Sequence, residues 1–79
     1  MTDKITEEKI LQEILAANKE ERTAIINVDS RAIAEEVFDT VSNMSYFIDR
    51  ADTRGALEVW GTLYDDTEWV MDIVYGQRE

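Results

Sequence analysis

The chain has 79 residues, with 18 Asp and Glu against 8 Lys and Arg, so its formal net charge is −10. It contains no His, no Cys and no Pro, which excludes a disulfide framework, a thiolate zinc site and His-dependent catalysis. The acidity argues against direct nucleic-acid binding, because that affinity comes mostly from Lys and Arg.

Residues 6–17 are predicted to form an amphipathic helix. Thr6 suits the N-cap position, and Glu7 and Glu8 fall in the first turn, where the helix dipole favours negative charge. The apolar residues of this segment recur at helical spacing and should form one buried stripe: Ile10, Leu11, Ile14 and Leu15.

Residues 23–28 favour a short strand, since they are rich in β-branched side chains. One face of this strand would carry Ala24, Ile26 and Val28. An alternative is a second short helix ending near Ile26, because Asn18 and Glu21 have the spacing of a capping box.

Residues 30–51 are predicted to form a long central helix capped by Asp29 or Ser30. Its apolar stripe recurs every three or four residues: Ile33, Val37, Val41, Met44, Ile48 and Ala51. The opposite side would be an acidic face made of Glu35, Glu36, Asp39 and Asp49. Such a face either imitates a run of phosphates or is simply solvated, as most charged helix faces are.

Residues 56–64 and 68–75 flank Asp65-Asp66-Thr67 and are predicted to form a β-hairpin. One face would be apolar if Leu63 pairs with Trp69, Gly61 with Met71, Val59 with Ile73 and Leu57 with Tyr75. A helical alternative exists because Leu57, Trp60 and Tyr64 also fit a helical stripe, although Gly61 would cost about 1 kcal/mol inside a helix.

These elements predict one small α+β domain over residues 1–79, with an all-α bundle as the alternative. No apolar run approaches the roughly 20 residues that a membrane span needs, and the beginning of the sequence lacks a signal-peptide pattern. The expected location is therefore the cytoplasm, with no membrane contact. A chain this short often needs a partner or a second subunit for stability.

The outer face of the predicted hairpin is the leading candidate site. It combines aromatic side chains, which bury area in an interface, with carboxylates, which pair with Arg or Lys. The proposed partner-binding residues are Glu58, Trp60, Tyr64, Asp65, Asp66, Glu68 and Asp72. The alternative is that a helix covers this face and that the acids only rim a core.

Catalysis and metal binding find little support in the sequence. No Gly-rich phosphate loop is present, and no serine has a His to activate it. Asp65, Asp66 and Glu68 lack the spacing and central Gly of an EF-hand loop. We therefore expect no enzyme activity, no cofactor and no metal.

The expected function is that of a non-enzymatic binding protein that inhibits or modulates a basic, nucleic-acid-handling partner by occluding its surface. Nucleic-acid mimicry is one form that this occlusion could take. In composition alone the chain is similar to small virus- or plasmid-encoded inhibitors of bacterial enzymes, and no motif supports that likeness. The alternative is an obligate homodimer or a small structural subunit with Trp60, Val70 and Val74 in the interface. A weaker alternative is an antitoxin or immunity-type partner.

Overall fold

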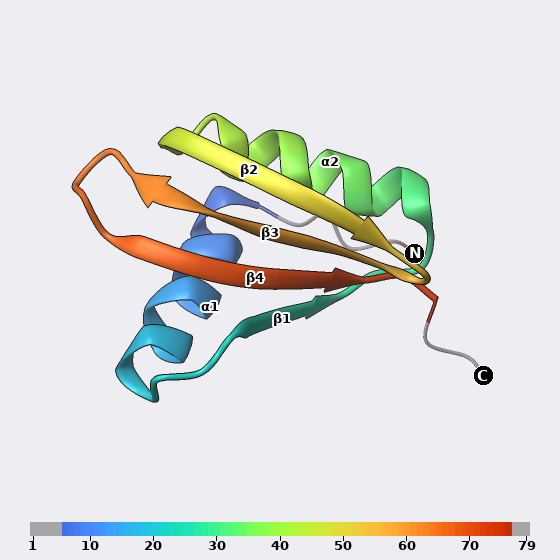
Figure 1. The fold of residues 1–79 in the computed structure, drawn as a ribbon, viewed down its shortest axis with the longest axis horizontal. Coiled ribbons are helices and arrows are strands. Elements are labelled where there is room, and N and C mark those ends of the chain that lie inside the picture. Colours follow the sequence, from blue (N-terminus) through green and yellow to red (C-terminus); the bar gives the residue numbers. More distant parts are fainter. Residues whose placement is uncertain (1–5, 77–79) are drawn as a thin grey trace.

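The computed structural model describes residues 6–76, which form one mixed sheet with two helices behind it (Figure 1). In chain order the elements are α1 (Glu7–Lys19), β1 (Ala24–Asn27), α2 (Arg31–Ser42), β2 (Ser45–Thr53), β3 (Ala56–Leu63) and β4 (Glu68–Val74). The strand order is β1-β4-β3-β2, with β1 parallel to β4 and the other neighbours antiparallel. The predicted α+β class is confirmed, and the all-α alternative is not supported.

Helix α1 begins as its sequence predicts. The Thr6 side chain accepts a hydrogen bond from the Lys9 amide at 3.2 Å, which satisfies one of the free amides of the first turn. Ile10 and Ile14 are fully buried, whereas Leu11 and Leu15 are 36% and 50% exposed. The predicted four-residue stripe is therefore only half buried, because the buried side of α1 runs through Ile10, Ile14 and Ala17.

Strand β1 confirms the predicted short strand and excludes the competing short helix. Ala24 and Ile26 point into the core, while Ile25 between them is 50% exposed. Ala24 lies opposite Met71 and starts a parallel ladder with β4. Asn18 caps no second helix, and its side-chain amide instead donates to the Glu68 carbonyl at 3.0 Å.

The predicted helix over residues 30–51 is wrong in its second half. Ser30 caps α2, with its hydroxyl accepting from the Ile33 amide at 3.3 Å, but the helix ends at Ser42. The chain then turns and runs back as β2, which pairs with β3 over its whole length apart from a bulge near Tyr46.

Two properties of the sequence explain this break. The helix closes with a tightened turn in which the Val41 carbonyl accepts from the Met44 amide at 3.1 Å, and the Ser45 hydroxyl adds a second donor to the same carbonyl at 3.0 Å. Tyr46, Phe47 and Ile48 favour extended structure, and the ladder with β3 pairs Phe47 with Thr62 and Ile48 with Gly61. The apparent helical stripe at Met44, Ile48 and Ala51 was coincidental.

The predicted hairpin is confirmed, as is its division into two faces, but its register is shifted by two residues. Gly61 lies opposite Trp69, Val59 opposite Met71 and Leu57 opposite Ile73. A two-residue slip keeps every side chain on its predicted face, because side-chain direction repeats every second residue. Hydrophobic patterning therefore does not distinguish the two registers.

The turn between β3 and β4 selects the register. Leu63 donates its amide to the Thr67 carbonyl at 2.8 Å, which leaves a three-residue loop. The Asp66 amide donates to the Leu63 carbonyl at 2.9 Å, and Asp66 has a φ of 74°. A residue in this left-handed conformation at the end of a three-residue loop is typical of hairpins with a bulged turn, and Asp tolerates it better than most residues.

The core lies between the helices and the inner face of the sheet. Its fully buried large side chains are Ile10, Ile14, Val37, Val41, Leu57, Val59, Met71 and Ile73. These residues come from both helices and both central strands, so the inner face of the sheet is buried in the hydrophobic core.

An ion-pair cluster fixes the edge strand β2 to α2. Arg50 donates to both Glu35 carboxylate oxygens at 2.9 and 3.2 Å and also pairs with Asp52 at 3.0 Å. Its guanidinium lies 4.7 Å from the centre of the Phe38 ring, a cation–π geometry. The hydrogen bond from Arg50 is the main cause that lowers the pKa of Glu35.

The lowered pKa of Glu35 predicts a pH-dependent contribution to folding. Because its folded pKa lies below the ordinary value of 4.5, the stabilisation is present above that pH and is lost as the pH falls through the lowered value. Glu35→Gln should therefore lower the midpoint of urea unfolding at neutral pH but leave it nearly unchanged near pH ~2. Glu36→Gln is the matched control, since Glu36 is exposed. An equal loss at both pH values would contradict this account.

Candidate binding face of the sheet

The outer side of the sheet is covered by neither helix within residues 6–76 (Figure 1). We call the outward-pointing side chains of the four strands the open face. Large apolar side chains are exposed on it: Ile25 at 50%, Phe47 at 51% and Val70 at 50%. Trp60 is partly exposed directly opposite Val70. Exposed apolar side chains from four adjacent strands therefore form one surface.

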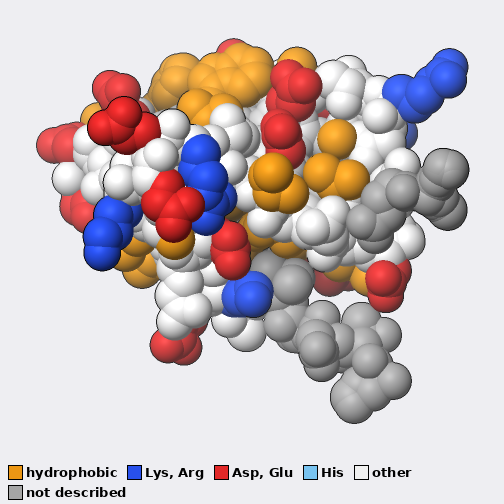
Figure 2. Space-filling model, turned by 90° about the horizontal axis from the view of Figure 1, so that it is seen from below, with side chains coloured by type: hydrophobic (Ala, Val, Ile, Leu, Met, Phe, Trp, Pro, Cys, Tyr) orange, Lys and Arg blue, Asp and Glu red, His pale blue; other side chains and the backbone are white. Residues whose placement is uncertain are grey.

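Every charged residue at an outward position of these strands is acidic, namely Asp49, Glu58, Glu68 and Asp72. None of the ion pairs among residues 6–76 involves these four carboxylates. Seen from below, acidic side chains lie between hydrophobic ones near the top of the space-filling view (Figure 2). The open face is thus mixed apolar and anionic.

Two of these carboxylates oppose one another at the centre of the face. Glu58 on β3 lies directly opposite Asp72 on β4, and like charges in this position destabilise a sheet. Asp49 on β2 lies directly opposite Trp60. The indole is therefore surrounded by carboxylates from its own strand and from both neighbouring strands.

The predicted partner-binding residues separate into two groups. Glu58, Trp60, Glu68 and Asp72 lie on the open face, as predicted from the alternation of the two strands. The others lie in the turn between β3 and β4: Tyr64, Asp65 and Asp66.

Both carboxylates of this turn accept hydrogen bonds, one from within the turn and one from β2. Asp65 accepts from the Thr67 amide at 3.0 Å, and hydrogen bonds from the Thr67 side chain and backbone lower the pKa of Asp65. Asp66 accepts from the Tyr46 hydroxyl at 2.8 Å, and this bond raises the pKa of Tyr46. Tyr64 remains 67% exposed, with its ring centre 6.3 Å from that of Tyr46. Through these hydrogen bonds, Asp65 and Asp66 stabilise the conformation of the turn.

The second predicted acidic surface does not exist as one face. Glu35, Glu36 and Asp39 lie on α2, whereas Asp49 lies on β2 and points to the open face. The prediction failed because it continued the helix through residue 51. Glu35 is also engaged with Arg50 and Arg31, so it is not a free charge.

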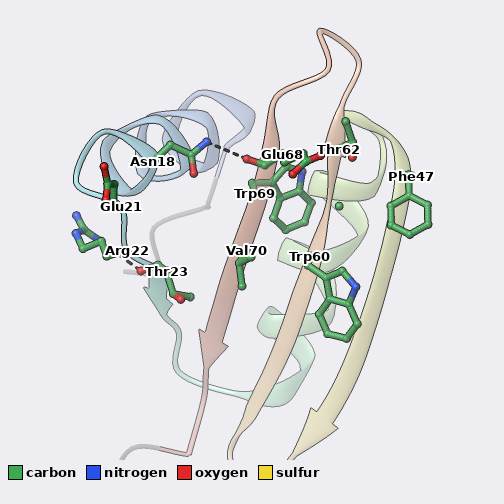
Figure 3. A pocket seen from close by; sticks show the side chains of 11 residues that line it. Asn18, Glu21, Arg22, Thr23, Phe47, Trp60, Thr62, Glu68, Trp69 and Val70 are labelled. Carbon is green, nitrogen blue, oxygen red and sulfur yellow. Dashed lines mark hydrogen bonds between the residues drawn. The ribbon is translucent and has the colours of Figure 1, made fainter.

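One end of the open face is hollowed between the strands and the segment that joins α1 to β1 (Figure 3). The hollow has a volume of about 620 Å³. Its walls include Asn18, Glu21, Arg22, Thr23, Phe47, Trp60, Thr62, Glu68 and Val70. It exists because β1 begins opposite Met71, so the first residues of β4 have no strand on that side.

The partner-binding residues predicted from the sequence do not include two exposed apolar residues of the open face, Phe47 and Ile25. Phe47 was assigned to a helix, and its role becomes visible only once β2 is recognised as a strand. Ile25 was detectable, because the alternation that buries Ala24 and Ile26 places it on the opposite side.

In comparisons with protein-family models, with curated proteins and with solved structures, no match to this chain was found. Neither helix within the described residues is long and apolar enough to cross a membrane. Within the same residues, Asp65, Asp66 and Glu68 do not gather into a group that could hold a metal ion. The function is therefore inferred from the open face itself.

The opposed carboxylates predict a gain in stability when one of them is removed. Asp72→Asn should raise the free energy of unfolding by about 0.5 kcal/mol at low salt, because it relieves repulsion across the strands. The gain should shrink at high salt, where exposed charges are screened. The control is Asp39→Asn on α2, which changes the net charge equally. Equal gains for the two variants would show that only net charge matters.

Proposed function

We propose that the protein is a non-enzymatic binding protein whose open face docks on a basic protein partner and blocks the partner's surface. The single observation that supports this is the composition of the open face, on which exposed apolar side chains alternate with exclusively acidic ones. Apolar and aromatic residues supply most of the free energy of an interface, while charges steer the encounter and select the partner.

The dimensions of the molecule suit such an interface. The sheet is seen face-on down the shortest axis, and that side of the molecule measures 35 × 24 Å. The outline of the molecule in this view is therefore about 800 Å², comparable with the area that each partner buries in a standard protein–protein interface. The molecule is therefore large enough to occlude a binding groove of moderate size.

The partner class that we propose is a nucleic-acid-handling protein. Such proteins carry clustered Lys and Arg to bind phosphates, and these clusters are the natural complement of an open face without any basic residue. Occupation of that cluster would exclude the nucleic acid, so the protein would act as an inhibitor.

An affinity experiment with matched baits tests the proposal. Wild-type protein should retain basic proteins from a lysate of its source organism at low salt and release them at about 0.5 M salt. Trp60→Ala should lose them, whereas Leu15→Ala should retain them, because Leu15 is an exposed apolar residue that lies on α1, away from the open face. Identical retention by both variants would contradict docking through the open face.

Self-association through the open face is a second candidate, favoured by the exposure of Phe47, Val70 and Ile25. Its electrostatics are unfavourable, because two copies of charge −10 would bring their acidic faces together. Light scattering at micromolar concentration distinguishes the candidates. A dimer that is lost in Trp60→Ala would favour self-association, and a monomer would exclude an obligate dimer.

A further inference from the structure

We propose that the open face binds an arginine side chain of the partner, with its guanidinium over Trp60 and paired with Glu58, Asp72 and Asp49. This inference rests on the proposed function and specifies the chemistry that the face recognises. It predicts that the partner segment presents an arginine flanked by apolar residues.

The opposite side of the same sheet shows this kind of site in its occupied form. There the Arg50 guanidinium lies 4.7 Å from the centre of the Phe38 ring and pairs with Glu35 and Asp52. The ring and Glu35 come from α2, while Asp52 lies two residues further along β2. A ring and carboxylates from adjacent elements thus hold one guanidinium, whose side chain is only 25% exposed.

The open face repeats the ring and the carboxylates but not the cation. Asp49 lies directly across from Trp60, and Glu58 precedes Trp60 by two residues on the same side of β3. Directly opposed residues have Cβ atoms about 5 Å apart, and diagonal ones such as Asp72 lie about 7–8 Å away. Both distances are within reach of a guanidinium above the indole, and Trp offers the strongest cation–π interaction of the aromatic residues.

The repulsion between Glu58 and Asp72 also points to a cation supplied from outside. These opposed carboxylates pair with no Lys or Arg among residues 6–76. A guanidinium shared by the two carboxylates would replace their repulsion with two attractive contacts. Binding would therefore remove the destabilisation that this repulsion causes in the free protein. A destabilising pair at an exposed site is the pattern expected where function opposes stability.

Arginine fits this site better than lysine. Its planar guanidinium stacks on a ring and presents several donors in one plane, so it can bond two carboxylates at once. An ammonium group is a compact, strongly hydrated charge and gives up more hydration against the indole. Val70, directly opposite Trp60, offers an apolar contact for a residue beside the arginine.

The test titrates the protein with two short blocked peptides, one of Ala, Leu and Arg and one with every Arg replaced by Lys. The Arg peptide should bind several-fold more tightly. It should shift the NMR signal of the Trp60 indole N–H but not that of Trp69, which is buried on the other face. Asp72→Asn should weaken its binding about tenfold, and Asp39→Asn should leave it unchanged.

Equal binding of the two peptides, abolished in both cases by Trp60→Ala, would overturn the preference for arginine and leave the proposed function standing. Binding that persists in Trp60→Ala, or no binding of either peptide, would overturn the inference and would also count against the open face as the binding surface. Equal weakening by Asp72→Asn and Asp39→Asn would show that only the net charge attracts the peptide, and it would overturn the proposed pairing with Asp72.

Discussion

Trp69→Ala is expected to lower the free energy of unfolding by roughly 3–5 kcal/mol, the cost of truncating a large buried aromatic side chain. Trp69 is 2% exposed, and its indole N–H donates to the Ser45 hydroxyl at 3.3 Å. Ser45 in turn donates to the Val41 carbonyl at the end of α2. The substitution therefore opens a cavity and also removes the link between β4, β2 and α2. For a domain of this size, the loss approaches the total stability.

Trp60→Ala provides the matched control, because it removes the same side chain from the neighbouring strand on the other face. Trp60 is only partly buried, so its removal should cost about 1 kcal/mol. Urea unfolding followed by far-ultraviolet circular dichroism measures both variants without relying on tryptophan fluorescence. Similar midpoints for the two variants would refute the assignment of inner and outer faces.

Gly61→Ala is expected to have the second largest effect. A Cβ atom added at Gly61 would lie 2.3 Å from the carbonyl oxygen of Phe47, a backbone atom that no side-chain rotation can move away. The bulge between Ser45 and Phe47 lies beside this site. Avoiding the clash requires β2 to separate from β3, with a cost of about 3 kcal/mol, at the upper end for overpacking.

Hydrogen exchange provides a specific measurement of this effect. In Gly61→Ala the amides of β2 should lose protection before those of β4, because the clash lies between β2 and β3. Thr62→Ala, at the next position and on the opposite face, should leave the protection of β2 nearly unchanged. Wild-type protection of β2 in Gly61→Ala would show that the strands tolerate the added methyl group.

The parts of the fold that the sequence predicted are those in which local patterns and tertiary environment agree. Thr6 and Ser30 mark the beginnings of the two helices, and both make the expected capping hydrogen bonds. Strict alternation assigned the two faces of β3 and β4 correctly, because burial of one face demands a period of two. The register required the turn geometry at Asp66, which alternation does not encode.

The local preference of Tyr46, Phe47 and Ile48 for extended structure does not suffice to predict strand β2. It is an edge strand whose outer face combines Phe47 with Asp49 and whose inner face combines Ile48 with an ion-pair cluster, so it has no clear apolar alternation. Its residues become extended because β3 offers a free edge, which is a property of segments later in the chain. Because β2 was not predicted, the candidate site lacked Phe47 and did not place Asp49 beside Trp60.

The central position of β4 has a consequence for the order of folding. Because β4 lies between β3 and β1, the ladder of β1 that begins at Ala24 can form only after β4, with Met71, is in place. The two hairpins β2–β3 and β3–β4 close short loops, whereas the β1–β4 ladder closes a long one and carries the larger entropic cost. Pulse-labelling during refolding should therefore show the three-stranded meander protected first, with α1 and β1 joining it last.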